Sequence, residues 1–343
     1  MKYNINRESS YIRKYEDIAE DFLNYLIEGG FIPLENKSDY QTPEGRGELI
    51  ELLVDKLYET EEIQGVQCST LNAFYCWCRF VIHHDPNTKG LVWNNLMKKL
   101  FLDIERHRFT SIMVSRGHGK SFFLGALYIP FKMWLLPKTQ VAYIANVPQM
   151  TKRTVRLFKD VVKENEMLLE KMNPEGKGEK EFVWTQTELD YNDGFFETTT
   201  VGGQIRSAHV NFLFLDDILR DDNTYTDADY EKFLFEQSLP IVNRKKARLA
   251  MVGTPQHRKD IFHLCMNSKQ DGTGEIVNHA YSAKEFYSVQ YPMVTDWDKK
   301  EILLPEIFQW KDVERTIKVA GERAFWKEYM LVCTDASNRI FND

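Results

Sequence analysis

Small and charged residues between positions 115 and 121 have the types and spacing of a phosphate-binding loop. They are Ser115, Arg116, Gly117, His118, Gly119, Lys120 and Ser121. An apolar run over 109–114 predicts a strand before them, and 122–134 is typical of a helix. In that arrangement backbone N–H groups face the phosphates, a lysine reaches the β- and γ-phosphates, and a serine hydroxyl binds Mg²⁺. The segment therefore predicts binding of a nucleoside triphosphate with Mg²⁺.

This loop departs from the full glycine-rich pattern at one position. The pattern has a glycine five residues before Gly119, where this chain has Val114. Taken alone, the segment also fits an exposed glycine-rich turn with a solvated lysine. The choice between the two interpretations depends on the other polar residues that a nucleotide site requires.

Two carboxylates, Asp216 and Asp217, follow a second apolar run over 212–215. Buried parallel strands read as continuous apolar runs, and α/β sheets build their sites where such strands end. We expect Asp216 to hold Mg²⁺, and Asp217 to orient and deprotonate the attacking water. Glutamate is the more frequent residue in the second role. The alternative is that both aspartates only cap the next segment.

A third expected strand, 247–252, ends at Gly253, Thr254 and Pro255. Proline cannot donate to a sheet ladder, so the strand must stop there and leave Thr254 at its tip. Thr254 would then lie near the γ-phosphate and respond to hydrolysis. A plain turn is the alternative for this short motif considered alone.

Arginines matter because an arginine in cis or from a neighbour can stabilise the charge on the transferring phosphoryl group, which changes rates by roughly 10³–10⁵ in related chemistry. Arg116, inside the loop, is the candidate in cis. Arg206 lies eleven residues before Asp217 and could act on a neighbouring subunit's site, or form an ion pair with a strand-end carboxylate. Arg220 and Arg258 are weaker candidates.

Together these residues resemble the ATPase domain of the large terminase subunit, the DNA-packaging motor of tailed bacteriophages. The P-loop of that family is similar to Ser-Arg-x-x-Gly-Lys-Ser without the first glycine, so Val114 agrees with it. Segments 202–206 and 253–260 resemble the family's glycine-rich hairpin and its coupling motif, and Leu304, Pro305, Glu306, Gly321, Phe325 and Tyr329 resemble the segment that leads to its second domain. The resemblance covers roughly 93–329.

The resemblance implies an ATP hydrolase that uses Mg²⁺ and drives double-stranded DNA into a procapsid. The implied partners are the portal protein, the small terminase subunit and further copies in a homo-oligomeric ring, a pentamer in the family. The implied location is the host cell cytoplasm during virion assembly. A complete large subunit also carries a nuclease domain. Because this sequence ends at Asp343, after an expected linker over 333–342, we expect it to lack that domain and to cut no DNA.

Helical and strand patterns along the chain predict an α/β fold. We expect a P-loop NTPase of the ASCE, RecA-like kind, with a mostly parallel sheet flanked by helices. Helices are predicted over 11–26 and 49–58 and around Trp77, and strands over 109–115, 140–145, 195–201, 211–215 and 247–252. The expected divisions are an N-terminal helical portion over 1–90, the ATPase core over 91–290, and a lid with linker over 291–343.

Composition narrows the class of protein. With 343 residues, of which 43% are hydrophobic, the chain can bury a sizeable core. The net charge of −7 argues against tight static binding to DNA, whose affinity depends on neutralising phosphates. We expect no membrane association. Two further functions stay open: another DNA-dependent, helicase-like ATPase, and a nucleotide-binding module with a weak or inactive site.

Overall fold

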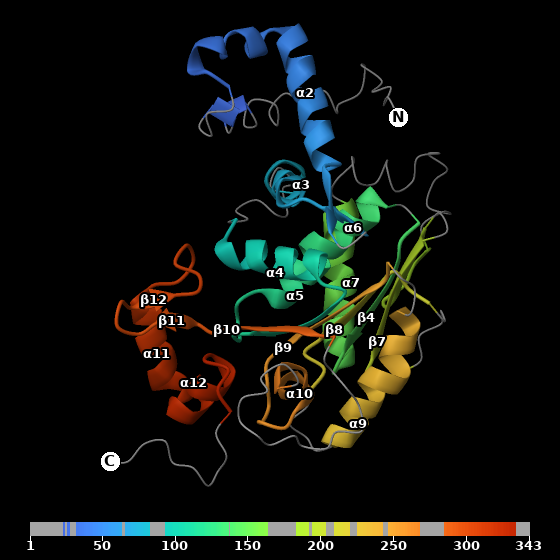
Figure 1. Ribbon diagram of the computed structural model, residues 1–343, viewed down its shortest axis with the longest axis vertical. Coiled ribbons are helices and arrows are strands. Elements are labelled where there is room, and N and C mark those ends of the chain that lie inside the picture. The colour runs from blue at the N-terminus through green and yellow to red at the C-terminus, as the bar shows by residue number, and fades with distance from the viewer. Residues whose placement is uncertain are drawn as a thin grey trace. The chain divides into compact units, whose positions relative to one another are not determined.

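The computed structural model describes residues 23–24, 26–27, 32–63, 66–82, 93–136, 138–163, 183–191, 194–203, 209–219, 225–242, 246–267 and 285–333. The chain divides into two compact units (Figure 1). One comprises Met1–Trp93 with Asp160–Lys171, and the other comprises Asn94–Lys159 with Met172–Asp343. Most of the helix predicted over 11–26 lies outside the described residues.

The first unit contains helices and a β-hairpin. Its elements are the short 3₁₀ turns η1 (Leu34–Asn36) and η2 (Asp39–Gln41), α2 (Pro43–Leu57), β1 (Thr60–Ile63), β2 (Val66–Ser69), α3 (Leu71–Cys76) and the π-helical η3 (Trp77–Ile82). Helix α2 begins six residues before the predicted start, because the Thr42 hydroxyl accepts a hydrogen bond from Gly45 N (3.1 Å) and Pro43 fits the first turn. This unit also contains a β-hairpin that the sequence did not predict, in which β1 and β2 pair antiparallel.

The second unit is built on a mostly parallel sheet. Within the described residues, eight strands lie in the order β10-β3-β9-β8-β4-β7-β6-β5. Neighbours from β10 to β7 are parallel, whereas β6 and β5 are antiparallel to their neighbours. The strands are β3 (Phe109–Val114), β4 (Gln140–Ala145), β5 (Val183–Trp184), β6 (Glu188–Tyr191), β7 (Gly194–Thr200), β8 (Phe212–Asp216), β9 (Arg248–Gly253) and β10 (Tyr287–Tyr291). The predicted α/β class is confirmed.

The strands predicted from apolar runs all form, each within one residue of its expected bounds. Strands β5, β6 and β10 were not predicted. All three lie at or near an edge of the sheet, and the residues of β10 are only partly buried until Tyr291. Such strands lack the continuous apolar run that marks a central parallel strand.

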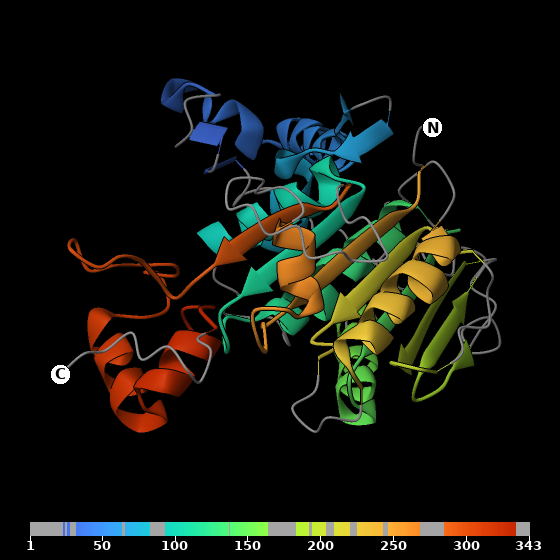
Figure 2. The same cartoon turned by 60° about the horizontal axis from the view of Figure 1, so that its bottom comes forward.

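Helices cover both faces of this sheet (Figure 2). One face carries α4 (Asn95–Arg106), the continuous helical run α5 (Lys120–Phe122), η4 (Phe123–Tyr128) and α6 (Ile129–Leu135), and α7 (Pro148–Lys163). The other carries α9 (Asp227–Lys232), its extensions η5 (Phe233–Ser238) and η6 (Leu239–Val242), and α10 (Ile261–Asn267). Among the helices of the described residues, none combines the length and the apolarity needed to cross a lipid bilayer.

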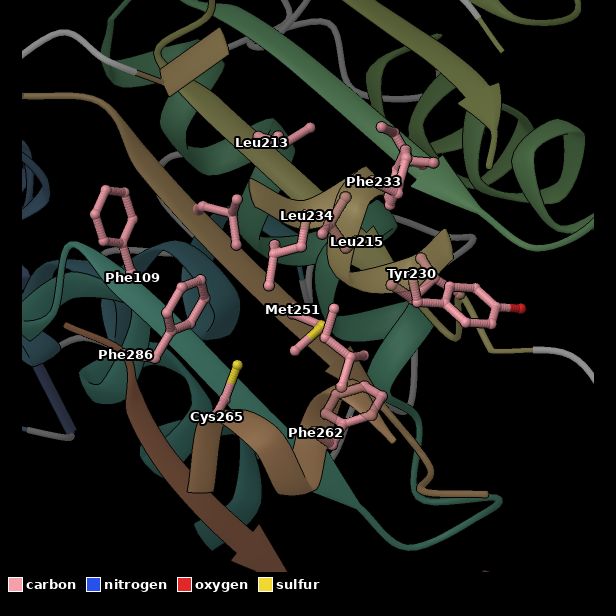
Figure 3. Packing of buried hydrophobic residues seen from close by; sticks show 14 of the residues in the cluster. Phe109, Leu213, Leu215, Tyr230, Phe233, Leu234, Met251, Phe262, Cys265 and Phe286 are labelled. Atoms are coloured by element: carbon pink, nitrogen blue, oxygen red, sulfur yellow. The ribbon is translucent and has the colours of Figure 1, made fainter. Parts of the chain in front are cut away.

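A hydrophobic core fills the space between the sheet and helices α9 and α10 (Figure 3). Leu213, Leu215 and Met251 from the strands meet Phe233 and Phe262 from the helices. All five side chains are buried, so water is excluded from the face of β8 and β9 that α9 and α10 cover. This packing fixes the ends of those strands, where the candidate site lies.

The opposite face contains a group of buried charges. Lys132 Nζ lies 2.9 Å from Glu105 Oε1, and the Tyr128 hydroxyl donates a hydrogen bond to the same oxygen (2.7 Å). The Arg248 guanidinium donates to the carbonyls of Ile104 (2.9 Å) and Glu105, near the end of α4. Carbonyls at a helix C-terminus lack intrahelical partners, so this arginine ties α4 to β9.

A small aromatic subdomain follows β10. It comprises β11 (Val294–Asp296), β12 (Glu301–Ile302), α11 (Trp310–Ala320) and α12 (Glu322–Glu328). Val294, Val313 and Phe325 are buried in its own cluster, and the Trp297 ring stacks on Trp326 with 5.7 Å between ring centroids. The subdomain therefore has a separate hydrophobic core.

Candidate nucleotide-binding site

The loop after β3 has the backbone that its glycines permit. Gly117 and Gly119 have φ angles of +78° and +77°, and the helical run begins at Lys120 immediately afterwards. Side chains with a Cβ rarely adopt this left-handed conformation, whereas glycine does so readily. The loop therefore reverses direction tightly and brings the start of the helix against the end of strand β3.

Lys120 is the centre of the site. Its side chain is 8% exposed, and its Nζ donates a hydrogen bond to Thr254 Oγ1 (2.9 Å) and lies 3.1 Å from Asp217 Oδ2. Strands β3, β9 and β8 are consecutive in the sheet, and these three residues lie just beyond their carboxyl ends. The structure thus brings together the three strand ends that the sequence indicated.

Asp217 is held in an unusual backbone conformation. Its φ is +48°, and its amide donates to Val252 O on the neighbouring strand (2.8 Å). Its Oδ1 accepts a hydrogen bond from Thr254 N (3.0 Å), while Oδ2 faces Lys120. Aspartate is among the residues that tolerate positive φ, and the three contacts fix the carboxylate direction.

Gly253 leaves room for this carboxylate, and an alanine there is expected to disturb it. A Cβ at position 253 would lie 2.7 Å from Phe262 Cζ and 3.1 Å from Asp217 Oδ1. Phe262 is fully buried, so its ring cannot simply move away. We expect Gly253→Ala to lower the free energy of unfolding by about 1–3 kcal/mol. Urea unfolding would measure the loss.

A suitable control for that substitution is Gly47→Ala in α2. Apart from chain neighbours and the nearby backbone of α2, no heavy atom of the described residues lies within 4 Å of the added Cβ at Gly47, and alanine favours a helix interior over glycine. This variant should keep wild-type stability or gain slightly. Equal stability of Gly253→Ala and wild type would contradict the packing argument.

Asp216 is fully buried beside this group. Its Oδ2 accepts a hydrogen bond from the Tyr143 hydroxyl, whereas its Oδ1 has no hydrogen-bond partner within the part of the chain that the structure describes. Burial and the charge of Asp217 raise the pKa of Asp216 to about 6, against the opposing effects of Lys120 and of the nearby Ser121 hydroxyl. Burial also raises the pKa of Tyr143, so its phenol stays protonated and donates.

The residues around Asp216 Oδ1 fit a divalent cation. A buried carboxylate oxygen without a partner is costly, and a cation would satisfy it. Mg²⁺ is bound in such sites through one or two protein oxygens, with phosphates and water as the other ligands. Among the described residues no group of three or more His, Cys, Asp or Glu side chains could hold a metal. The donor set here, Asp216 with Ser121, suits Mg²⁺ that arrives with a nucleotide.

The first residues of the loop are hydrogen-bonded to strand β10 and to the aromatic subdomain. Ser115 N donates to Tyr291 O (3.1 Å), and Arg116 N donates to Glu328 O (2.9 Å). The Arg116 guanidinium lies 3.4 Å from Glu328 Oε2, and its side chain is 67% exposed. Arg116 thus contacts α12 in this structure, and its predicted role at the phosphates stays a prediction.

His118 is a structural member of the loop. Its Nδ1 lies 2.9 Å from Arg116 O, which can only accept, so Nδ1 carries the proton. Its ring centroid lies 5.1 Å from that of Phe308. Burial and the charge of Lys120 lower the pKa of His118, which keeps it neutral at physiological pH. Lys120 therefore supplies the buried positive charge of the loop.

The segment after Thr254 is folded around Asp260. This fully buried carboxylate accepts hydrogen bonds from Gln256 N (2.6 Å), His257 N (3.2 Å) and His263 N (3.0 Å). Burial alone would raise the pKa of Asp260, but the His263 contacts and these amides lower it. Asp260 therefore stabilises the turn that follows strand β9.

The sequence also indicated three further arginines. Arg206 and Arg220 fall outside the described residues. The Arg258 Nε donates to Cys333 O (2.7 Å).

Sequence reasoning missed Tyr143 and Glu328. A tyrosine within the otherwise apolar stretch of β4 was a signal for Tyr143, because a buried hydroxyl needs a partner. Nothing in the sequence marked Glu328.

No protein-family model matches this chain, and no curated protein matches its sequence. Solved structures do match. The large terminase of bacteriophage HK97 matches with 14% identity over 70% of this chain and 50% of that one, with a TM-score of 0.49. The ATPase domain of the Thermus phage P74-26 large terminase matches with 15% identity over 71% and 95%, also with a TM-score of 0.49. For the N-terminal domain of the DNA packaging ATPase from bacteriophage phi29 the values are 14% identity, 50% and 84% coverage, and a TM-score of 0.35. The chain spans about half of the HK97 protein, and its structure is similar, at low sequence identity, to phage terminase ATPase domains.

Proposed function

We propose that this chain is an Mg²⁺-dependent ATP hydrolase whose site lies at the ends of β3, β8 and β9. The observation that carries the proposal is the contact of the buried Lys120 ammonium with both Asp217 and Thr254. In the proposed complex Lys120 binds the β- and γ-phosphates, and the loop amides from Gly117 to Ser121 surround them. Ser121 and Asp216 would hold Mg²⁺, which supplies charge neutralisation for the developing transition state.

In the proposed reaction, Asp217 takes the role of general base. The triphosphate must first displace this carboxylate as the partner of the Lys120 ammonium, which breaks the ion pair between Asp217 and Lys120. Oδ2 then becomes available to accept a proton from the attacking water, while the Thr254 amide keeps Oδ1 in place. In the same step Thr254 Oγ1 loses the hydrogen bond that Lys120 Nζ donates to it. The contacts at the end of β9 therefore depend on whether a nucleotide is bound.

We further propose that the hydrolysis drives double-stranded DNA into a viral procapsid. The support for this part is the resemblance of the P-loop, the aspartate pair and the Gly253–Asp260 segment to the large terminase family. The portal protein, the small terminase subunit and further copies of the chain are the proposed partners, with Arg206 as the proposed residue in trans. Mixing Arg206→Ala with Lys120→Ala protein and recovering activity would support supply of an arginine in trans.

A nucleotide-binding module with an inactive site is the second candidate function. The observation in its favour is that Lys120 and Asp217 already neutralise each other, with an aspartate where glutamate is more frequent. Such a module would bind Mg-ATP through the same loop. It would release no phosphate, so turnover separates the two candidates.

The proposed function can be tested with wild type and Lys120→Ala. Wild type should bind a fluorescent ATP analogue and release phosphate only when Mg²⁺ is present. Loss of the ammonium should weaken nucleotide binding by about tenfold or more, since a charge-assisted contact to phosphate contributes about 1.5–3 kcal/mol. Lys132→Arg, which keeps the charge at another buried lysine, is a control for general effects on folding. Binding of equal strength by Lys120→Ala and wild type would contradict the assigned loop.

A further inference from the structure

Tyr143 is a buried polar side chain next to the residues of the proposed site. It lies on β4, where Tyr143 pairs with Phe214 and Ala145 pairs with Asp216 on the neighbouring strand β8. The side chain is fully buried, and its hydroxyl donates a hydrogen bond to Asp216 Oδ2. The tyrosine therefore reaches along the sheet to the carboxylate at the end of the next strand.

Because of this contact, the two carboxylate oxygens of Asp216 have different surroundings. Oδ2 is occupied by the tyrosine, whereas Oδ1 is buried and, among the described residues, has no hydrogen-bond partner. A carboxylate with one oxygen fixed cannot rotate freely about its Cβ–Cγ bond. Oδ1 is then kept directed at the place where Ser121 would share a cation with it.

We infer that Tyr143 is the positioning residue that orients Asp216 for Mg²⁺ in the nucleotide complex. This inference rests on the proposed function, because it concerns the same metal. Residues that orient a metal ligand through a hydrogen bond change metal affinity by about 10–100-fold when removed from comparable sites. Tyr143 differs from a ligand because its oxygen contacts the carboxylate and leaves Oδ1 for the cation.

The variant Tyr143→Phe removes the hydroxyl and keeps the ring. With Mn²⁺ as the probe and ADP bound, electron paramagnetic resonance should show Mn²⁺ bound about tenfold more weakly than in wild type. The Mg²⁺ concentration that half-saturates phosphate release should rise by a similar factor, while kcat at saturating Mg²⁺ recovers. Affinity for the nucleotide in EDTA should not change.

Tyr128→Phe is the matched control. Tyr128 in η4 is equally buried, and its hydroxyl also donates to a carboxylate, that of Glu105 in α4. If loss of any buried tyrosine hydroxyl weakened the protein generally, both variants would show the same metal dependence. The inference requires that Tyr128→Phe stay within about twofold of wild type in Mn²⁺ affinity, well below the factor expected for an orienting residue.

A second measurement covers the case in which Tyr143→Phe does not fold. In protein with 3-fluorotyrosine at position 143, the ¹⁹F resonance should shift when Mg²⁺ is added to the ADP complex, and 3-fluorotyrosine at position 128 should shift less. Unchanged Mn²⁺ affinity in Tyr143→Phe, or no ¹⁹F response at position 143, would overturn the role of Tyr143 alone. Failure of wild type to bind Mg-nucleotide at all would instead overturn the proposed function, and this role with it.

Discussion

Asp217→Asn is expected to lower kcat for phosphate release by about 10³-fold, within the range of general-base catalysis. The amide keeps the shape of the side chain, and its oxygen can still accept the hydrogen bond from Thr254 N. Asparagine also tolerates the positive φ at this position. The substitution therefore removes the negative charge and proton acceptor and leaves the local fold unchanged.

The same variant should bind ATP at least as tightly as wild type. In the structure Asp217 competes with any phosphate for Lys120, and the neutral amide competes less. Single-turnover and steady-state phosphate release, together with binding of a fluorescent ATP analogue, would measure both effects. Asp227→Asn, at a partly exposed carboxylate at the start of α9, is the control and should keep full activity. Wild-type turnover by Asp217→Asn would rule out Asp217 as the base.

Lys132→Met is expected to lower the free energy of unfolding at neutral pH by about 3–5 kcal/mol. Lys132 and Glu105 are both buried, and removal of the lysine takes away the ammonium that lies 2.9 Å from the Glu105 carboxylate. Methionine fills a similar volume, so the loss reports the buried charge more than a cavity. Urea unfolding followed by near-ultraviolet circular dichroism would measure it.

The double variant Lys132→Met with Glu105→Gln is the matched control. It removes both charges and keeps an acceptor for the Tyr128 hydroxyl, so it should regain more than half of the loss, because neutral replacements of buried ion pairs are often tolerated. A double variant no more stable than Lys132→Met would show that the lysine acts through packing.

The stability difference between wild type and Lys132→Met should depend on pH. Burial alone raises the pKa of Glu105, but the charges of Lys132 and Arg248 outweigh it and lower the pKa below its usual 4.5. A lowered pKa in the folded state adds stability that is present above the unfolded value and lost as the pH falls through the folded value. The difference should therefore be full at neutral pH and become smaller as the pH is lowered below 4.5. A difference constant down to pH 3 would contradict this origin.

The central strands and the loop were predictable from the sequence because their signals are local. The mostly apolar runs over β3, β8 and β9 favour buried strands, and the glycines at 117 and 119 permit the tight reversal before Lys120. The carboxyl ends of parallel strands meet at one edge of a sheet, so Lys120, Asp217 and Thr254 were expected together. Edge strands such as β10 have weaker patterns and were missed.

By itself the sequence determined the α/β class, the central strands and the identity of the polar residues at their ends. Only the tertiary structure decided which of these residues touch: that Lys120 pairs with Asp217, that Tyr143 holds Asp216, and that Arg116 contacts Glu328. Residues 116 and 328 are far apart in the chain, and no periodicity or propensity links them. Such pairs depend on strand order and on the packing of elements across the fold, which fix the neighbours of a side chain once the whole chain is folded.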